Sequence, residues 1–208
     1  MCYLDLLSRD NQRLQSHAKI LVELSREHEL RMWLAISGFQ HGYARWCSGE
    51  VNAGEAHMRA GIAANIEQGN KRWLPLFQGR LAEIEAEAKA IDAALSRIEQ
   101  ALALADETGE QWTDAFLHRL RGEILLKRDP ANTAPAEEAF LTAIAIAQRQ
   151  KARSFELSAA MSMARLWHDR GKPQQARELL APVYGWFTEG FDTLDLKEAK
   201  ALLEEIAA

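Results

Sequence analysis

The side chains best suited to bind a metal or to carry a proton in this chain are its six histidines. They occupy positions His17, His28, His41, His57, His118 and His168. Two ligands on one helix must lie three or four residues apart to face the same metal, and no two of these histidines have that spacing. We therefore expect neither a metal site nor a cofactor.

The remaining candidates for chemistry are a thiol and a Gly-Lys pair. Cys47 follows Trp46 near an expected helix end and has no accompanying His and Asp pattern, so we expect a buried structural thiol. Gly171 and Lys172 lack the glycine five residues earlier that a phosphate-binding loop requires, and we expect them to form a turn. The sequence therefore predicts a chain without catalytic activity.

The aromatic segment 184–191 has two interpretations. It could form a platform that binds a ligand or a nucleotide base, or it could join one helix to the last one. We favour the second, because Gly190 can take the left-handed conformation and Phe191 can fold back onto the preceding turn. Asp192 or Thr193 can then cap the final helix.

The composition excludes several classes of partner. The chain has 25 Lys and Arg against 30 Asp and Glu, and the resulting net charge of -5 argues against a general affinity for nucleic acid. No apolar run approaches the roughly 18 residues of a membrane span, and the first residues do not form a signal peptide. Two cysteines cannot form a disulfide framework in 208 residues, so a cytoplasmic location is expected.

Helix-forming residues dominate the chain, and runs of β-branched residues are absent. Apolar residues recur with helical period, as at Ile91, Leu95, Ile98 and Leu102. Gly and Pro residues mark most breaks. The expected helices cover residues 3–8, 11–27, 30–48, 51–68, 72–88, 90–108, 111–128, 135–150, 154–170, 173–188 and 194–206. Residues 85–90 lack a turn glycine, so one merged helix there is the alternative to two.

Small residues recur at a nearly constant spacing, which indicates stacked helix pairs. One set, spaced by 40, 40 and 42 residues, comprises Gly42, Ala82, Gly122 and Ala164. A second set comprises Gly61, Ala101, Ala143 and Val183, and an aromatic set comprises Trp33, Trp73, Trp112 and Phe155. The chain is expected to form a single helical-repeat domain over residues 1–208. Its repeats cover approximately residues 1–28, 29–69, 70–109, 110–151 and 152–190, with a capping helix over 193–208.

The alternation of small and bulky residues resembles the tetratricopeptide repeat, extended from 34 to about 40 residues. The bulky positions are Met58, Ile98, Phe140 and Leu180. The early Trp and Tyr positions typical of that repeat are not consistently filled. The resemblance implies an all-α, right-handed solenoid of about five antiparallel helix pairs with a C-terminal capping helix.

The segments 118–126, 143–150, 166–172 and 180–203 carry a more specific resemblance. They resemble the C-terminal tetratricopeptide-like tail of bacterial signalling proteins in which a class III adenylate/guanylate cyclase precedes an ATPase. Leu194 and Lys151 depart from the proline and glycine usual there. The resemblance implies a non-catalytic protein-interaction or regulatory scaffold module. The alternative is a domain that senses a small-molecule effector and controls an attached ATPase or cyclase.

A partner-binding groove is expected on the concave face of such a solenoid. Its predicted lining consists of Tyr43, Glu83, Arg119, Glu123, Arg165 and His168. This mixed lining suits a peptide or a partner helix, and the alternative is ordinary solvated charge.

The N-terminal residues look like half of a helix pair, which predicts a fragment of a larger protein. The apolar side chains concerned are Tyr3, Leu4, Leu6 and Leu7. An exposed edge of this kind could form a homodimer. The alternative is a frayed, monomeric N-terminus.

Overall fold

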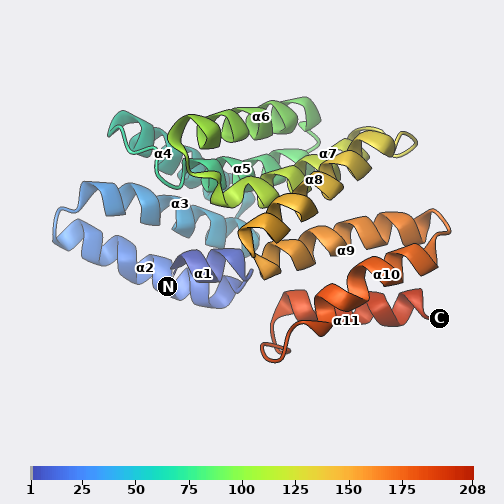
Figure 1. Cartoon of the computed structure of the whole chain (residues 1–208). Coiled ribbons are helices and arrows are strands. Elements are labelled where there is room, and N and C mark those ends of the chain that lie inside the picture. Colours follow the sequence, from blue (N-terminus) through green and yellow to red (C-terminus); the bar gives the residue numbers. More distant parts are fainter. Residues whose placement is uncertain (1) are drawn as a thin grey trace.

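The computed structural model describes residues 2–208, which contain eleven α-helices, one 3₁₀ turn and no β-strand (Figure 1). The helices are α1 (Cys2–Leu7), α2 (Asn11–Glu27), α3 (Arg31–Cys47), α4 (Val51–Glu67), α5 (Leu74–Glu87), α6 (Ile91–Thr108), α7 (Asp114–Arg128), α8 (Ala134–Gln150), α9 (Arg153–Asp169), α10 (Pro173–Gly185) and α11 (Leu194–Ile206), with the 3₁₀ turn η1 at Gln111–Thr113.

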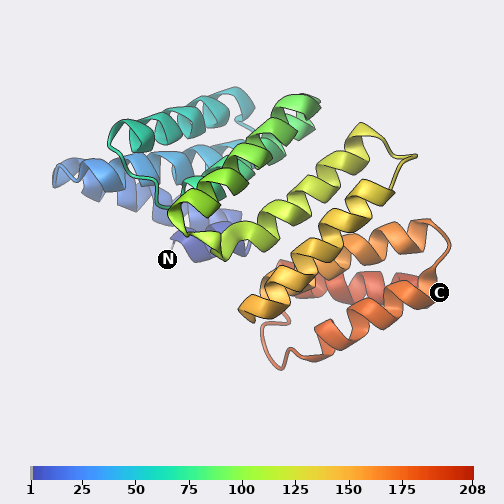
Figure 2. The same cartoon turned by 45° about the horizontal axis from the view of Figure 1, so that its top comes forward.

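Consecutive helices pack against one another as antiparallel pairs, and the pairs stack into a curved array (Figures 1 and 2). Four complete pairs run from α3 to α10, α1 and α2 form a shorter first pair, and α11 covers the last pair. The predicted all-α solenoid of about five helix pairs with a C-terminal capping helix is confirmed.

The small residues lie where the paired helices cross. At Gly61 of α4, a Cβ atom would lie 2.7 Å from the backbone nitrogen of Phe39 on α3. At Gly122 of α7, a Cβ atom would overlap the ring of Phe140 on α8. Phe140 itself is fully buried, so the missing Cβ atoms permit the close helix approach that the spacing predicts.

Two helix ends use a lysine where a glycine is more usual. α5 and α6 are separate, because Lys89 adopts a left-handed φ of 64° and Ala90 N donates to Glu85 O at 2.8 Å. Lys151 ends α8 with a φ of 56°. The left-handed conformation costs a non-glycine residue roughly 1–2 kcal/mol. The prediction of two helices over 72–108 is confirmed.

The aromatic set forms a partial ladder along the array. Trp73 and Trp112 lie edge to face at 5.3 Å, and Trp112 and Phe155 are stacked at 6.4 Å. Trp33 does not join them and is 40% exposed. The place beside Trp73 is taken by Tyr3, whose ring centroid lies 3.8 Å away.

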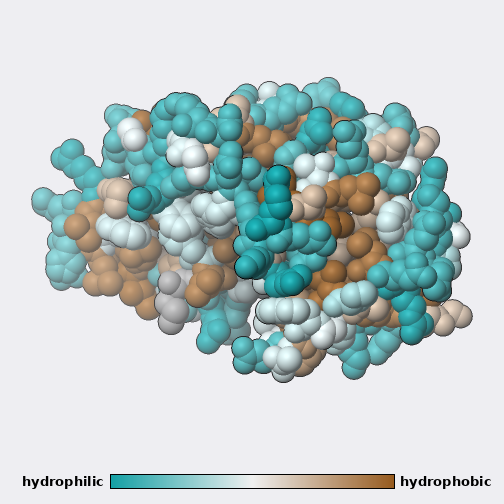
Figure 3. All heavy atoms as spheres, in the orientation of Figure 1, coloured by the Kyte–Doolittle hydropathy of each residue, from teal (hydrophilic) through white to brown (hydrophobic). Residues whose placement is uncertain are grey.

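The N-terminal helix is more completely packed than the sequence suggested. Leu6 is fully buried, Tyr3 and Leu7 are partly buried, and only Leu4, at 67%, is largely exposed. Of the four apolar side chains singled out in the sequence, only Leu4 therefore offers an exposed surface. Figure 3 shows hydrophobic side chains gathered over α2, the neighbouring helix at this end of the array.

The turn into the last helix follows the helix-joining interpretation. α10 ends at Gly185 instead of continuing to residue 188. Gly190 takes a left-handed φ of 76°, and Thr193 precedes α11 as its N-cap residue. Phe191 lies edge to face with Tyr184 at 6.0 Å, so the aromatic residues pack on the end of α10.

Candidate functional site

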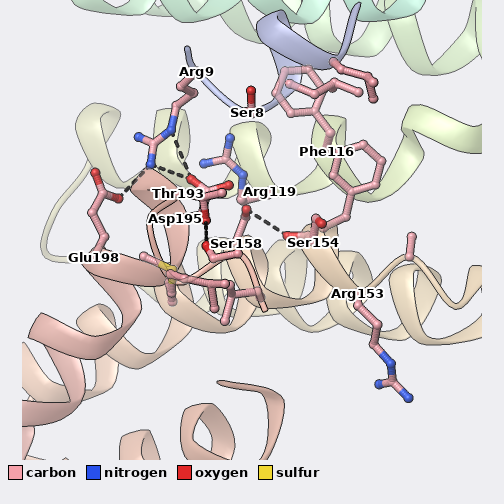
Figure 4. A pocket seen from close by; sticks show the side chains of 18 of the residues that line it. Ser8, Arg9, Phe116, Arg119, Arg153, Ser154, Ser158, Thr193, Asp195 and Glu198 are labelled. Atoms are coloured by element: carbon pink, nitrogen blue, oxygen red, sulfur yellow. Dashed lines mark hydrogen bonds and ion pairs between the residues drawn. The ribbon is translucent and has the colours of Figure 1, made fainter. Parts of the chain in front are cut away.

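The concave side of the array carries a cavity of about 770 Å³ that is partly open to solvent (Figure 4). Its walls come from α1, α2, α5, α7, α9 and α11, so both ends of the chain contribute. The cavity is the candidate binding site, because concave pockets of roughly 300–1,000 Å³ are where proteins most often hold small ligands.

Four of the six predicted groove residues line this cavity, namely Glu83, Arg119, Glu123 and Arg165. Tyr43 is only 5% exposed and lies beneath the guanidinium of Arg80, at 5.4 Å from ring centroid to Cζ. His168 lies toward Glu205 of α11, at 3.9 Å from Nδ1 to Oε1, and is not part of the cavity wall.

Arg80 is the central buried cation of the wall, and the sequence analysis missed it. Its side chain is almost fully buried, its Nη1 pairs with Glu83 at 2.8 Å, and its Nη2 donates to Leu6 O at 2.9 Å. Cζ also lies 4.8 Å from the Phe116 ring centroid. An i, i+3 Arg-Glu pair on a helix was the available signal.

Glu83 is held ionised by this arrangement. Burial alone would raise the pKa of its carboxyl group, but the charges of Arg80 and Arg119 outweigh burial and leave that pKa below its ordinary value. Arg80 therefore acts as a fixed charge that tethers α1 to α5 and Glu83 as its counter-ion. Neither is a candidate acid or base for catalysis near neutral pH.

Arg119 projects from α7 into the cavity (Figure 4). Nη1 pairs with Glu123 Oε1 at 2.5 Å, and Ser162 Oγ donates to the same oxygen at 2.7 Å. Among the residues that the structure describes, no acceptor binds the N–H groups on Nε and Nη2 of Arg119. The guanidinium therefore keeps donors free for a ligand.

An ion-pair cluster joins the two ends of the array and closes one side of the cavity. Arg9, which follows α1, reaches Asp195 at 2.6 Å and Glu198 at 2.8 Å, both on α11 (Figure 4). Arg165 of α9 lies 3.6 Å from Glu198. The Arg9 contacts span 186 and 189 residues of sequence, and no local pattern marks them.

The opposite wall is apolar. Trp112, Phe116 and Phe155 line it, and the ring centroids of Phe116 and Phe155 lie 6.5 Å apart. Met161 and Phe187 also line the cavity and pack in the apolar cluster that includes Leu196 of α11. The cavity thus combines a guanidinium group with free donors and an aromatic surface, which suits binding better than bond chemistry.

One His–carboxylate pair lines the cavity, with His17 Nδ1 lying 2.6 Å from Asp5 Oδ2. Two titratable groups with raised pKa values lie outside the cavity. Burial raises the pKa of the Cys47 thiol, so the reactive thiolate is disfavoured, and Cys47 does not line the cavity. Burial, with a smaller contribution from Asp106, raises the pKa of Asp114 to about 6, but Asp114 also lies outside the cavity.

Residues 2–208 contain no group of three side chains able to hold a metal ion. Over the same residues, no helix is both long and apolar enough to span a membrane.

Comparison with known proteins places the fold among helical repeats. No family model matches this sequence, and no curated protein matches it either. Among solved structures, BtubC (BKLC) from P. vanneervenii is similar with a TM-score of 0.66 and 16% identity, covering 98% of this chain and 89% of that one. A point variant of a putative kinesin light chain from Podosopora anserina, with nearly identical TPR-like repeats, gives a TM-score of 0.58 at 16% identity, covering 88% and 94%. At such low identity these likenesses establish the fold, which is that of a tetratricopeptide-like repeat protein.

Proposed function

We propose that this chain is a non-catalytic, cytoplasmic protein-interaction module and that its concave cavity receives a segment of the partner. The observation that carries the proposal is the convergence of Glu83, Arg119, Glu123 and Arg165 on one cavity of about 770 Å³. Tetratricopeptide-like folds, which serve as protein-interaction scaffolds, support the same role.

A partner pull-down from the source cytosol tests this proposal. The wild-type chain is expected to recover a protein that Arg119→Glu fails to recover, because the reversed charge repels Glu123 and changes the cavity wall. Arg121→Glu is the matched control on α7, since Arg121 does not line the cavity. Equal recovery by all three chains, or none by any, contradicts the proposal.

We propose further that the module belongs to a bacterial cyclase–ATPase signalling protein, on the resemblance of residues 118–203 alone. The encoding gene tests this. A reading frame that continues upstream into cyclase and ATPase domains supports the proposal, and a frame without them contradicts it. The isolated chain is expected to show no cyclase or ATPase turnover.

Effector sensing is the second candidate function, and one observation favours it. The Arg9 ion pairs with Asp195 and Glu198 close one side of the cavity, so a small molecule could be largely enclosed. A thermal-shift screen of metabolites distinguishes the two candidates. A stabilising metabolite without any recovered protein partner would favour the sensor.

Self-association through the N-terminal edge also remains a proposal. Leu4 is exposed there, and Ile20 and Leu24 of α2 are 53% and 45% exposed. Light scattering over a range of concentrations is expected to show a dimer that Leu4→Glu weakens. A mass that stays monomeric at every concentration would rule out this edge as an interface.

A further inference from the structure

We infer that the cavity binds a small amphipathic organic acid, with its carboxylate on Arg119 and its apolar body on the aromatic wall. The inference rests on the proposed use of this cavity as a binding site and names the chemistry of its ligand. Three observations support it: donors on Arg119 without acceptors, an aromatic surface beside Arg119, and the Arg9 ion pairs that narrow one side of the cavity.

The donor imbalance points to an anion. Among the carboxylates that line the cavity, Glu83 is paired with Arg80, Glu123 with Arg119, and Asp195 with Arg9. Arg119, in contrast, has N–H groups on Nε and Nη2 with no acceptor among residues 2–208. Because a guanidinium donates but cannot accept, a carboxylate is the ligand group that satisfies these donors best.

The aromatic surface begins beside this guanidinium. Cζ of Arg119 lies 5.7 Å from the Phe116 ring centroid, and Phe155 continues the wall toward Trp112. A ligand whose carboxylate meets Arg119 would therefore place its next atoms against Phe116. This geometry suits an acid whose aromatic or aliphatic body lies a few bonds from the carboxylate.

The ion pairs of Arg9 narrow one side of the cavity and leave room for a compact ligand. Arg9 bridges from the end of α1 to Asp195 and Glu198 of α11 (Figure 4). A compact ligand can occupy the 770 Å³ of the cavity with both bridges intact.

Calorimetric titration with matched acids and amides tests the inference. The probes are 2-naphthoate and decanoate, each compared with its neutral primary amide. We expect at least one acid to bind once per chain and about 10–100-fold more tightly than its amide, because a hydrogen bond to a charged group contributes this much. In Arg119→Gln the preference for the acid is expected to disappear.

Arg121→Gln is the control for removing one positive charge from α7, and it should retain the preference. Failure of both acids to bind with a Kd below about 1 mM, or equal binding of acid and amide, would overturn the inference. Survival of the preference in folded Arg119→Gln would do the same. If Arg119→Gln fails to fold, Arg119→Lys tests the inference instead. The affinity for the acid must change in Arg119→Lys and stay unchanged in Arg121→Lys.

The outcomes separate this inference from the proposed function. Recovery of a partner that depends on Arg119, with no acid binding, overturns the inference and leaves the interaction role intact. Saturable binding of an acid with no recovered partner supports the inference and contradicts that role.

Discussion

Replacing Gly61 by alanine tests how closely α3 and α4 approach. A Cβ atom at Gly61 would lie 2.7 Å from the backbone nitrogen and 2.9 Å from the Cα of Phe39. Both are backbone atoms, so no side-chain rotation can relieve the overlap and the two helices must move apart. At Gly38, which lies inside α3, a Cβ atom would meet nothing within 4 Å.

The two substitutions share their chemistry and differ only in available space. Gly38→Ala is expected to stabilise the protein by about 0.5–1 kcal/mol, since alanine loses less conformational entropy in a helix. Gly61→Ala gains the same term but adds an overpacking cost of about 1–3 kcal/mol. The difference between the variants, about 1–3 kcal/mol, therefore isolates the close approach.

Thermal unfolding of both variants followed by circular dichroism measures this difference. For a chain of this size, it corresponds to a melting temperature about 2–12 °C lower for Gly61→Ala than for Gly38→Ala. Equal melting temperatures would refute the reasoning, because they would show that the helices can separate at Gly61 without loss of packing.

Three further predictions concern other parts of the molecule. Gly122→Leu should lower the free energy of unfolding by about 1–3 kcal/mol in urea titrations, since its side chain would overlap the buried Phe140 ring. Burial raises the pKa of Asp114 from 3.8 to about 6, so its contribution to stability should fall as pH rises from about 4 to about 6. Asp114→Asn should therefore raise the urea midpoint at pH 7 and have less effect at pH 4. Arg9→Gln and Asp195→Asn should each cost less than about 1 kcal/mol, with a double-mutant coupling that disappears in 1 M salt.

The repeat pattern was predictable because it records a steric requirement. Where helices cross at the distance seen at Gly61, only a very small side chain fits, and a bulky one such as Met58 must fill the adjoining space. Such requirements recur with each helix pair and leave a period in the sequence. Glu83, Glu123 and Arg165 line the cavity for the same reason, since positions next to a buried column on a helix face a consistent direction.

Other features could not be predicted, because they depend on how repeats distant in sequence meet. Trp33 fits the spacing of the aromatic set, but it is exposed. The residue that stacks on Trp73 is Tyr3 from the N-terminal helix. Tyr43 satisfies the groove spacing but is covered by Arg80, whose long side chain spans from α5 to the inner surface of α3. Sequence spacing predicts the direction in which a side chain points. Its burial depends on which residues the curved array of helix pairs brings next to it.

The narrow side of the cavity follows from that curvature more than from the ion pairs across it. The side chains of Arg9, Asp195 and Glu198 are 36%, 23% and 32% exposed, and pairs at such exposure contribute no more than about 1 kcal/mol each. Forcing two helices apart at a crossing costs more, because inserting extra atoms into a packed core costs about 1–3 kcal/mol. The helix crossings therefore set the separation of the two ends, and Arg9 bridges a gap that packing has already narrowed. Loss of the bridge should loosen one side of the site while the wall that carries Arg119 and Phe116 stays in place.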